Sequence, residues 1–337
     1  MDNYKNKTVL VTGCSGFIGS NLIYKLMNIK NIKIIALGRN EKKIKDCFCI
    51  FLKKKNFKYI VHDISLPINF IKERIDYIFH CASPQEKFKI LNYPVDVIRP
   101  NLFGVINCLE FLKYQKKKNK TNGRFVLFSS IAIYAHKSKV DVFLNEKQTN
   151  NSDFIDSDYS PYSQSKRASE VIVNSYVKQH KLNAVICRLS TVYGYAKNYT
   201  NTAFFDFVKK AIQRKNINIK DTNFFRRDNI YISDAINGIN IVATKGLKGE
   251  AYNISSGGEK DNFKSVAEIA KIIADESNKL FKKKIKVNFR KSKKKIKLKL
   301  PGIILDNSKL KKLKWNLKIK FKIGIFFTIK NFIKFKA

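Results

Sequence analysis

The chain has 337 residues, is 44% hydrophobic and contains only six prolines, which together exclude a largely disordered protein. Its 67 Lys and Arg residues outnumber 26 Asp and Glu residues, a formal net charge of +41 that a nucleic acid or a membrane surface would suit. The excess is mostly lysine and accompanies abundant Ile, Asn, Phe and Tyr, as an A/T-biased coding sequence would produce. We therefore favour a solvated basic surface over a nucleic-acid partner, with an anionic partner as the alternative.

Membrane and metal sites are also not expected. No apolar stretch reaches the roughly 18 to 20 residues that a membrane span needs, and Met1–Lys5 leads into a strand-like run without a signal sequence. These features predict a cytoplasmic protein. Six cysteines are scattered, several of them in apolar runs, and four histidines show no metal-ligand spacing. This pattern predicts buried free thiols and no metal.

Strand-like runs alternate with amphipathic helical stretches through the first two-thirds of the chain. Strands are expected at Thr8–Thr12, Lys33–Leu37, Tyr59–His62, Tyr77–Cys81, Phe125–Ser129 and Ala184–Leu189. Helices are expected, for example, at Gly19–Met27, Val105–Tyr114 and Ser163–His180. Such alternation predicts an α/β fold with a doubly wound parallel sheet of the Rossmann type, whose ligands bind at the carboxyl ends of the strands.

The pattern loosens after residue 194, where helices are expected near Ala203–Arg214 and Ser265–Ser277. We therefore expect a Rossmann domain over residues 1–194 and a smaller α+β lobe over 195–337, with some exchange of segments between them. The lysine-rich segment 282–299 has low complexity and is expected to be flexible or to lie at an edge.

Three glycines stand three residues apart between the first strand and the first helix: Gly13, Gly16 and Gly19. Glycine lets the backbone approach a pyrophosphate closely, while the following helix presents its free N–H groups and positive dipole end. This context predicts a dinucleotide site. The form T-G-x-x-G-x-x-G, with Phe17 and Ile18 inside it, resembles the extended short-chain dehydrogenase/reductase family, specifically its NAD-dependent nucleotide-sugar epimerases, dehydratases and reductases.

The resemblance continues at a Tyr-x-x-x-Lys pair, Tyr162 and Lys166, at the start of a helical stretch. Residues four apart share a helix face, so both side chains can point into one site. A nearby ammonium and the nicotinamide ring would lower the pKa of the tyrosine, which is about 10 when free, and make it an acid/base group. The resemblance implies catalytic roles for both residues and for Ser130, whose hydroxyl would bind the reacting sugar oxygen.

The residue types at the two positions directly after Ser130 limit the reactions that can be expected. In the family's 4,6-dehydratases they are an Asp-Glu pair that acts at C5 and C6 of the sugar, and decarboxylases keep the Glu. Here they are Ile131 and Ala132, neither of which can transfer a proton. The resemblance therefore implies hydride transfer at a sugar carbon, usually C4, by an epimerase or a ketoreductase. The sequence leaves that choice, the nucleotide and the sugar open.

A binding protein of the same fold is the alternative from another functional class. Some relatives only bind a dinucleotide and regulate other processes or bind RNA, and the high positive charge would suit that role. The presence of Ser130, Tyr162 and Lys166 speaks against it, because a binding module has no need for this set.

Other positions match cofactor contacts of the family. Asp63 and Ile64 stand where relatives contact the adenine, Ala82 follows a strand end that lies along the cofactor, and Asn101 matches an asparagine beside the active site. Arg39 stands near the place of the acid with which NAD-selective relatives bind the ribose 2′-hydroxyl. The missing carboxylate slightly favours NADP(H) over NAD, and both stay open.

Two further residues match the family's substrate side. Arg227 would pair with the nucleotide diphosphate through its guanidinium fork, and Thr191 stands where relatives often have Asn. Relatives commonly dimerise through a helix pair that includes the Tyr162–Lys166 helix, so we expect a homodimer that binds a nucleotide sugar. The final amphipathic stretch around Phe326–Phe332 is expected to be a packed helix rather than a membrane anchor.

Overall fold

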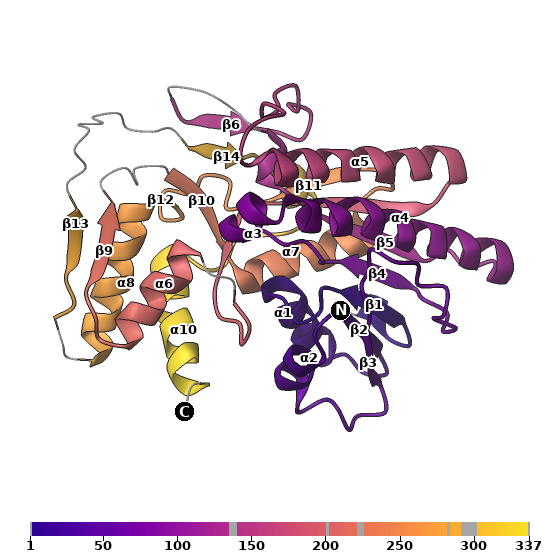
Figure 1. Cartoon of the computed structure of the whole chain (residues 1–337), viewed down its shortest axis with the longest axis horizontal. Helices are drawn as coiled ribbons and strands as arrows, with labels where there is room; N and C mark the ends of the chain where they lie inside the picture. Colours follow the sequence, from indigo (N-terminus) through magenta and orange to yellow (C-terminus); the bar gives the residue numbers. More distant parts are fainter. Residues whose placement is uncertain are drawn as a thin grey trace. The chain divides into compact units, whose positions relative to one another are not determined.

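The computed structural model describes residues 2–134, 140–199, 202–220, 226–281, 284–290 and 302–335. The chain forms two compact units that alternate along the sequence (Figure 1). Unit 1 comprises residues 1–135, 149–188 and 239–252, and unit 2 comprises residues 136–148, 189–238 and 253–337. The expected division of the chain at residue 194 remains a prediction about its domains.

Unit 1 is built on a seven-stranded sheet with the order β11-β7-β5-β4-β1-β2-β3. The strands are β1 (Thr8–Thr12), β2 (Lys33–Gly38), β3 (Phe57–Val61), β4 (Tyr77–His80), β5 (Arg124–Ser130), β7 (Asn183–Leu189) and β11 (Ala251–Ile254). β1 pairs in parallel with both β2 and β4, and the chain continues outward from it on either side. The predicted doubly wound parallel sheet is confirmed.

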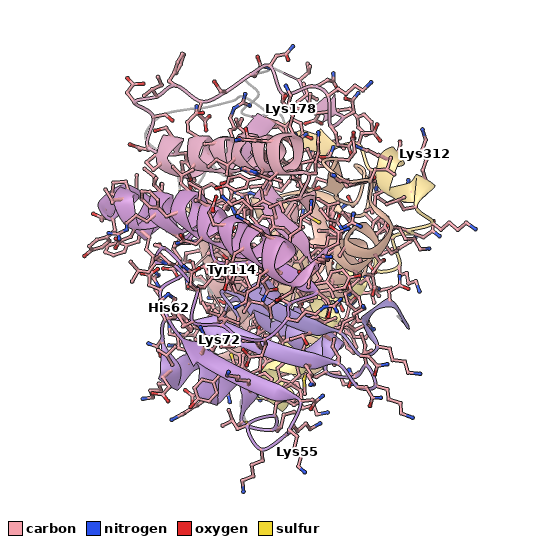
Figure 2. The ribbon with its side chains drawn as sticks, turned by 90° about the vertical axis from the view of Figure 1, so that its right-hand side faces the viewer. Lys55, His62, Lys72, Tyr114, Lys178 and Lys312 are labelled. Atoms are coloured by element: carbon pink, nitrogen blue, oxygen red, sulfur yellow. The ribbon has the colours of Figure 1, made fainter. Side chains whose placement is uncertain are left out.

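Helices α4 and α5 lie side by side against this sheet, as Figure 2 shows with Tyr114 labelled on α4 and Lys178 on α5. The helices of unit 1 are α1 (Phe17–Leu26), α2 (Glu41–Phe48), α3 (Lys87–Asn92), α4 (Pro94–Asn119) and α5 (Ser160–His180), with 3₁₀ turns η1 (Asp2–Tyr4) and η2 (Ile131–Tyr134). Alternate strand residues pack against α4 and α5 in one buried cluster that includes Leu10, Ile78, Phe125, Ala184, Leu109 and Val173. Because alternate strand residues share a sheet face, period-two burial aligns the strands with these helices.

Both long helices begin earlier than expected. α4 starts at Pro94, whereas the sequence predicted a start at Val105. The first turns were not predicted because Pro100, which lies inside the helix, interrupts the residue pattern that normally indicates a helix. α5 starts at Ser160 with Pro161 in its first turn, a position where proline is well tolerated. Both helices end at a lysine in the left-handed region: Lys120 at φ 48° and Lys181 at φ 54°.

Two small sheets are formed by the described residues of unit 2. A five-stranded sheet has the order β12-β10-β14-β6, with β8 paired to β10, and a second sheet pairs β13 with β9. Its strands are β6 (Val142–Leu144), β8 (Thr191–Tyr193), β9 (Ile217–Lys220), β10 (Arg226–Tyr231), β12 (Phe263–Ser265), β13 (Val287–Arg290) and β14 (Ile303–Leu305). Its helices are α6 (Ala203–Ile212), α8 (Val266–Phe281), α9 (Ser308–Lys312) and α10 (Phe321–Lys334), while α7 (Ile232–Lys245) begins in unit 2 and ends in unit 1. The expected α+β character of the smaller lobe is confirmed.

The final helix, α10, is packed into unit 2. Phe321, Ile325 and Ile329 are fully buried, and the ring of Phe321 lies 4.7 Å from that of Tyr193. Within the described part of the chain, no helix has the length and apolarity required to cross a bilayer. The expected packed helix is therefore confirmed. Of the lysine-rich segment 282–299, residues 287–290 form β13, whereas residues 282–283 and 291–299 lie outside the described residues.

The cysteines follow the expectation only in part. Cys14, Cys47, Cys108 and Cys187 are buried and form no disulfide among the described residues, so the expectation is confirmed for these four. It is wrong for Cys49, which is exposed, and holds only in part for Cys81, which is half-buried although its thiol is desolvated. Both lie just beyond the end of an element, Cys49 after α2 and Cys81 after β4.

Candidate active site

The glycine turn after β1 is held against the end of β4. Gly13 has a φ of +61°, a conformation that favours glycine, and a Cβ atom there would lie 2.7 Å from the Cα of Ala82. A Cβ on Gly19 would lie 2.6 Å from the carbonyl oxygen of Gly13. Gly16 is the N-cap residue of α1 and makes no side-chain capping bond. The turn therefore brings bare backbone and a helix N-terminus together, which fits a pyrophosphate.

Phe17 and Ile18 form the first turn of the same helix. Phe17 is buried, whereas Ile18 is half-buried. The two side chains thus anchor the helix end whose backbone N–H groups the resemblance assigns to the cofactor.

A buried histidine joins three segments beneath this turn. The Nδ1 atom of His80 lies 3.0 Å from Oγ1 of Thr12, and its Nε2 atom lies 3.1 Å from the carbonyl oxygen of Pro100. Because a carbonyl only accepts, Nε2 carries the proton and Nδ1 accepts from Thr12. Burial, aided by the charge of Lys166, lowers the pKa of His80 to about 3, so the ring is neutral. His80 therefore ties the ends of β1 and β4 to α4 without adding charge.

Arg39 and Asp63 face each other beyond β2 and β3. The Nη1 atom of Arg39 lies 3.8 Å from the Oδ2 atom of Asp63; the Arg39 side chain is exposed and Asp63 is half-buried. Burial would raise the pKa of Asp63, but hydrogen bonds from Ser65 and the charges of Arg39 and Arg99 lower it overall. Ile64, the next residue, is buried and accepts a hydrogen bond from Asn107 through its carbonyl.

The predicted catalytic residues Ser130, Tyr162 and Lys166 are brought together at the carboxyl end of β5. Lys166 is buried, its Nζ atom donates to the carbonyl oxygen of Phe128 at 2.6 Å, and it lies 5.9 Å from the centre of the Tyr162 ring. The hydroxyl groups of Tyr162 and Ser130 are hydrogen-bonded. The three side chains thus form one cluster, as their positions in the sequence predicted.

The ionisation of this cluster is dominated by burial. Burial lowers the pKa of the Lys166 ammonium to about 8, while the charges of Cys81 and Glu170 act in the opposite direction. Burial raises the pKa of Tyr162, and the hydrogen bond with Ser130 offsets this only in part. For the protein alone the direction is therefore opposite to the expected lowering, because desolvation of the phenolate outweighs its polar contacts.

The wall beside Tyr162 is apolar. Tyr162 forms a buried cluster with Ile90 of α3 and Val97 of α4, and Ala132 packs against this cluster. The backbone N–H of Ala132 donates to Oγ of Ser130 at 3.1 Å. Ile131 is half-buried beside it. Of the four side chains in this apolar cluster, that of Tyr162 carries an exchangeable proton and the other three are hydrocarbon.

Asn101 lies in α4 with one polar atom unused. Its Nδ2 atom donates to Oγ of Ser165 at 2.9 Å, and its backbone carbonyl accepts from Ser169. Its Oδ1 atom is buried and has no hydrogen-bond partner among the residues that the structure describes. The contacts with Ser165 and Ser169 hold α4 against α5, the helix that carries the predicted catalytic residues.

The two predicted substrate residues lie in unit 2. Thr191 opens β8 and is half-buried, whereas Arg227 is exposed on β10. β8 and β10 pair in parallel with Thr191 opposite Asn229, so Thr191 and Arg227 stand on neighbouring strands. Their roles toward a substrate remain predictions.

One buried network was missed in the sequence. Glu170 of α5 binds Ser129 and Arg188, and Arg188 in turn donates to the hydroxyl of Tyr134. The available signal was that Glu170 lies four residues after Lys166, on the same face of the helix. As for metals, the described residues contain no group of three or more His, Cys, Asp or Glu side chains able to hold an ion.

Comparison with known proteins decides the family. The model for the "NAD dependent epimerase/dehydratase family" matches residues 9–255. The chain belongs to this family. The predicted resemblance to extended short-chain dehydrogenase/reductase enzymes is thereby confirmed.

Relatives in this family include several sugar-nucleotide dehydratases. The chain is 31% identical over 274 residues to a dTDP-D-glucose 4,6-dehydratase of Dictyostelium discoideum, covering 78% of this chain but only 62% of that relative. It is 27% identical over 338 residues to the human dTDP-D-glucose 4,6-dehydratase, covering 96% and 89% of the two chains. The chain thus spans less than two thirds of the first relative and most of the second.

Solved structures share the fold. An epimerase from Methanothermobacter thermautotrophicus superimposes with a TM-score of 0.81 at 22% identity, over 98% of this chain and 94% of that one. The UDP-glucuronic acid 4-epimerase of Bacillus cereus, in complex with UDP-glucuronic acid and NAD, gives a TM-score of 0.79 at 24% identity, over 98% and 100%. These likenesses confirm the predicted fold class.

Proposed function

We propose that this protein is an NAD(P)-dependent nucleotide-sugar 4-epimerase or 4-ketoreductase. The observation that carries the proposal is the pairing of a complete Ser130, Tyr162 and Lys166 cluster with an apolar neighbourhood. Ile131 and Ala132 cannot transfer the protons that dehydration at C5 and C6 requires. The set therefore supports chemistry in which one tyrosine exchanges one proton. A non-catalytic RNA-binding or regulatory role is not favoured.

In this mechanism Tyr162 is the acid/base group at the reacting hydroxyl or ketone of the sugar. Ser130 donates a hydrogen bond that orients the sugar oxygen toward the phenol. Lys166, charged and buried, offers a positive charge to the phenolate that forms when Tyr162 gives up its proton. A bound nicotinamide dinucleotide supplies or accepts the hydride.

We propose that unit 1 carries the cofactor, with its contacts from Gly13, Gly16, Gly19 and the first turn of α1. The tight approaches at Gly13 and Gly19 support this, since they leave the turn without side chains that a cofactor would have to displace. We further propose that Asp63, Ala82 and Asn101 contact the cofactor, as the resemblance implies.

The dinucleotide is proposed to be NADP(H) or NAD(H), with NADP(H) slightly favoured. Arg39 favours binding of the 2′-phosphate of NADP(H), because its guanidinium is exposed and lies at the end of β2. The carboxylate of Asp63, 3.8 Å away, limits this preference because it would repel the same phosphate.

Substrate binding and assembly are also proposals. Arg227 would bind the diphosphate and Thr191 the substrate in unit 2. A homodimer through α4 and α5 is supported by large apolar side chains exposed on both helices, for example Phe103 and Val171.

The Tyr162→Phe variant tests the reaction. The expected result is a loss of turnover of about 100- to 10,000-fold, because the substitution removes only the hydroxyl that exchanges the proton. Binding of the dinucleotide, followed by its fluorescence, should stay unchanged. Tyr159→Phe is the matched control, since Tyr159 lies one helical turn earlier, outside the cluster, with its ring half-exposed.

The assay offers UDP-glucose, UDP-glucuronic acid, dTDP-glucose and a 4-keto nucleotide sugar and follows products by proton NMR, with the dinucleotide released from the purified protein identified first. Stoichiometric bound NAD with a C4 epimer as product would favour an epimerase. Consumption of NADPH with a 4-keto sugar would favour a reductase. A product with a new C6 methyl group would show dehydration and contradict the proposal, as would full turnover by Tyr162→Phe.

A further inference from the structure

Glu170 is a buried carboxylate on the same face of α5 as the proposed catalytic pair. It lies four residues after Lys166 and eight after Tyr162, and only 7% of it is exposed. Burying a carboxylate is costly unless hydrogen bonds and an opposite charge compensate it. The protein supplies both.

The carboxylate contacts two different strands of the sheet. Its Oε1 atom accepts from Oγ of Ser129 on β5 at 2.5 Å and from Nε of Arg188 on β7 at 3.0 Å. Its Oε2 atom accepts from Nη2 of Arg188 at 2.7 Å. The Arg188–Glu170 pair is thus bidentate and buried on both sides, a geometry that fixes orientation as well as distance.

Arg188 extends the network to the turn that follows Ser130. Its Nη1 atom donates to the hydroxyl of Tyr134 at 3.0 Å, and its guanidinium lies 5.2 Å from the centre of the Tyr134 ring. Tyr134 is the last residue of η2, the turn that begins directly after Ser130. The pair therefore joins α5, β5, β7 and η2 at one point.

Three consecutive residues of β5 are hydrogen-bonded to side chains of α5. Lys166 donates to the carbonyl of Phe128, Glu170 accepts from the hydroxyl of Ser129, and Ser130 is hydrogen-bonded to Tyr162. A shift of α5 along β5 would break all three contacts together. Of these three, the Glu170 contact lies outside the proposed reaction and is reinforced by an ion pair.

We propose, on the basis of the proposed function, that Glu170 is a positioning residue for Tyr162 and Lys166. Its carboxylate holds α5 in register with β5. It also supplies a negative charge, on the same helix, that acts on the Lys166 ammonium.

The charge of Glu170 acts on Lys166 within a small set of ionisable neighbours. The groups near Lys166 are Tyr162 and Glu170 on its own helix, and His80 and Cys81 at the end of β4. His80 is neutral, and burial raises the pKa of the Cys81 thiol well above its usual value. Glu170 is therefore the anion of this set, and its charge acts on the ammonium in addition to its ion pair with Arg188.

The test is Glu170→Gln, which keeps the shape and removes the charge. Protein labelled with ¹³C at Cε of lysine is titrated by NMR, and the Lys166 signal is assigned by its absence in Lys166→Met. The midpoint, near 8 in the wild type, should fall by at least about half a pH unit because the ammonium loses its counter-charge. Turnover should fall about 10-fold or more, with its pH profile displaced in the same direction.

Glu110→Gln is the matched control. Glu110 also accepts from a tyrosine of α5, Tyr176, at 2.5 Å and pairs with Lys113, but it lies on α4 away from the cluster. It should leave both the Lys166 midpoint and turnover unchanged. A folded Glu170→Gln protein whose midpoint matches this control overturns the proposal.

Loss of Glu170 leaves Arg188 buried without its partner, so a second variant covers the case in which Glu170→Gln does not fold. Ser129→Ala breaks the contact with β5 and keeps the ion pair, and we expect turnover to fall at unchanged dinucleotide affinity. Turnover equal to the wild type overturns the register argument.

The NMR titration needs no substrate. A wild type that turns over no nucleotide sugar therefore refutes the proposed function, while the midpoint still decides the role of Glu170 toward Lys166.

Discussion

Burial of the Lys166 ammonium should make the stability of this protein depend on pH in a definite direction. A lysine has a usual pKa of 10.5, and burial lowers that of Lys166 to about 8, a difference of about 2.5 units. At about 1.4 kcal/mol per pH unit, keeping this charge buried costs about 3.5 kcal/mol of unfolding free energy. Lys166 is only 2% exposed, so solvent screening does not reduce this cost.

The sign follows from which state holds the proton. Between about pH 8 and 10.5 the unfolded chain keeps the lysine protonated while the folded protein releases that proton. The unfolded state therefore binds more protons, and the contribution of Lys166 to stability rises with pH over this window. Below about pH 8 the full cost is present, and above 10.5 it vanishes.

Lys166→Met is the perturbation that isolates this effect. Methionine has a similar length and no charge, so the variant should exceed the wild type in unfolding free energy near neutral pH. That excess should shrink by about 2 to 3 kcal/mol between pH 7 and pH 10. Denaturant titrations followed by far-ultraviolet circular dichroism at each pH measure the difference, in which other ionising groups largely cancel.

Lys113→Met serves as the control, because Lys113 is a half-exposed lysine on α4. Its difference from the wild type should stay flat across the same pH range. If the curves for Lys166→Met and the wild type also run parallel, Lys166 is not buried as an ammonium with a lowered pKa, and the reasoning is refuted.

Two further predictions concern the cofactor turn and its selectivity. Gly19→Ala should lower the unfolding free energy by about 1 to 3 kcal/mol, since its Cβ would lie 2.6 Å from a backbone oxygen, whereas Gly16→Ala meets the same oxygen at 3.2 Å and should cost less. Equal thermal midpoints for the two variants would contradict the packing of α1 on the turn. Arg39→Gln should weaken NADPH binding about 10-fold and leave NADH binding unchanged, as measured by dinucleotide fluorescence. An equal loss for both would remove the argument for a 2′-phosphate partner.

Much of the fold could be predicted because its signals are local. Buried strands such as β1 and β2 read as short apolar runs, and β1 agrees with the expected Thr8–Thr12 at both ends. The pairing of Tyr162 with Lys166 follows from helix geometry alone, and their meeting with Ser130 follows from the parallel sheet.

The differences between the predictions and the structure have physical reasons. The start of α4 was hidden because Pro100 disfavours a helix locally, and tertiary packing overrides that preference. Cys49 and Cys81 stand next to apolar residues, yet their exposure depends on where an element ends. The raised pKa of Tyr162 could not be foreseen because desolvation depends on the apolar side chains of α3 and α4 around it.

By itself, the sequence determined the sheet type from the alternation of strand-like and helical stretches, the glycine turn from its local spacing, and the proposed catalytic residues from motifs that resemble the family's. The tertiary structure alone decided that Glu170 meets Ser129 and Arg188, that His80 is neutral and that Lys166 is buried with a lowered pKa. Hydrogen-bond partners and dielectric environment come from segments far apart in sequence. No local pattern records those contacts, and they set the ionisation on which the proposed chemistry depends.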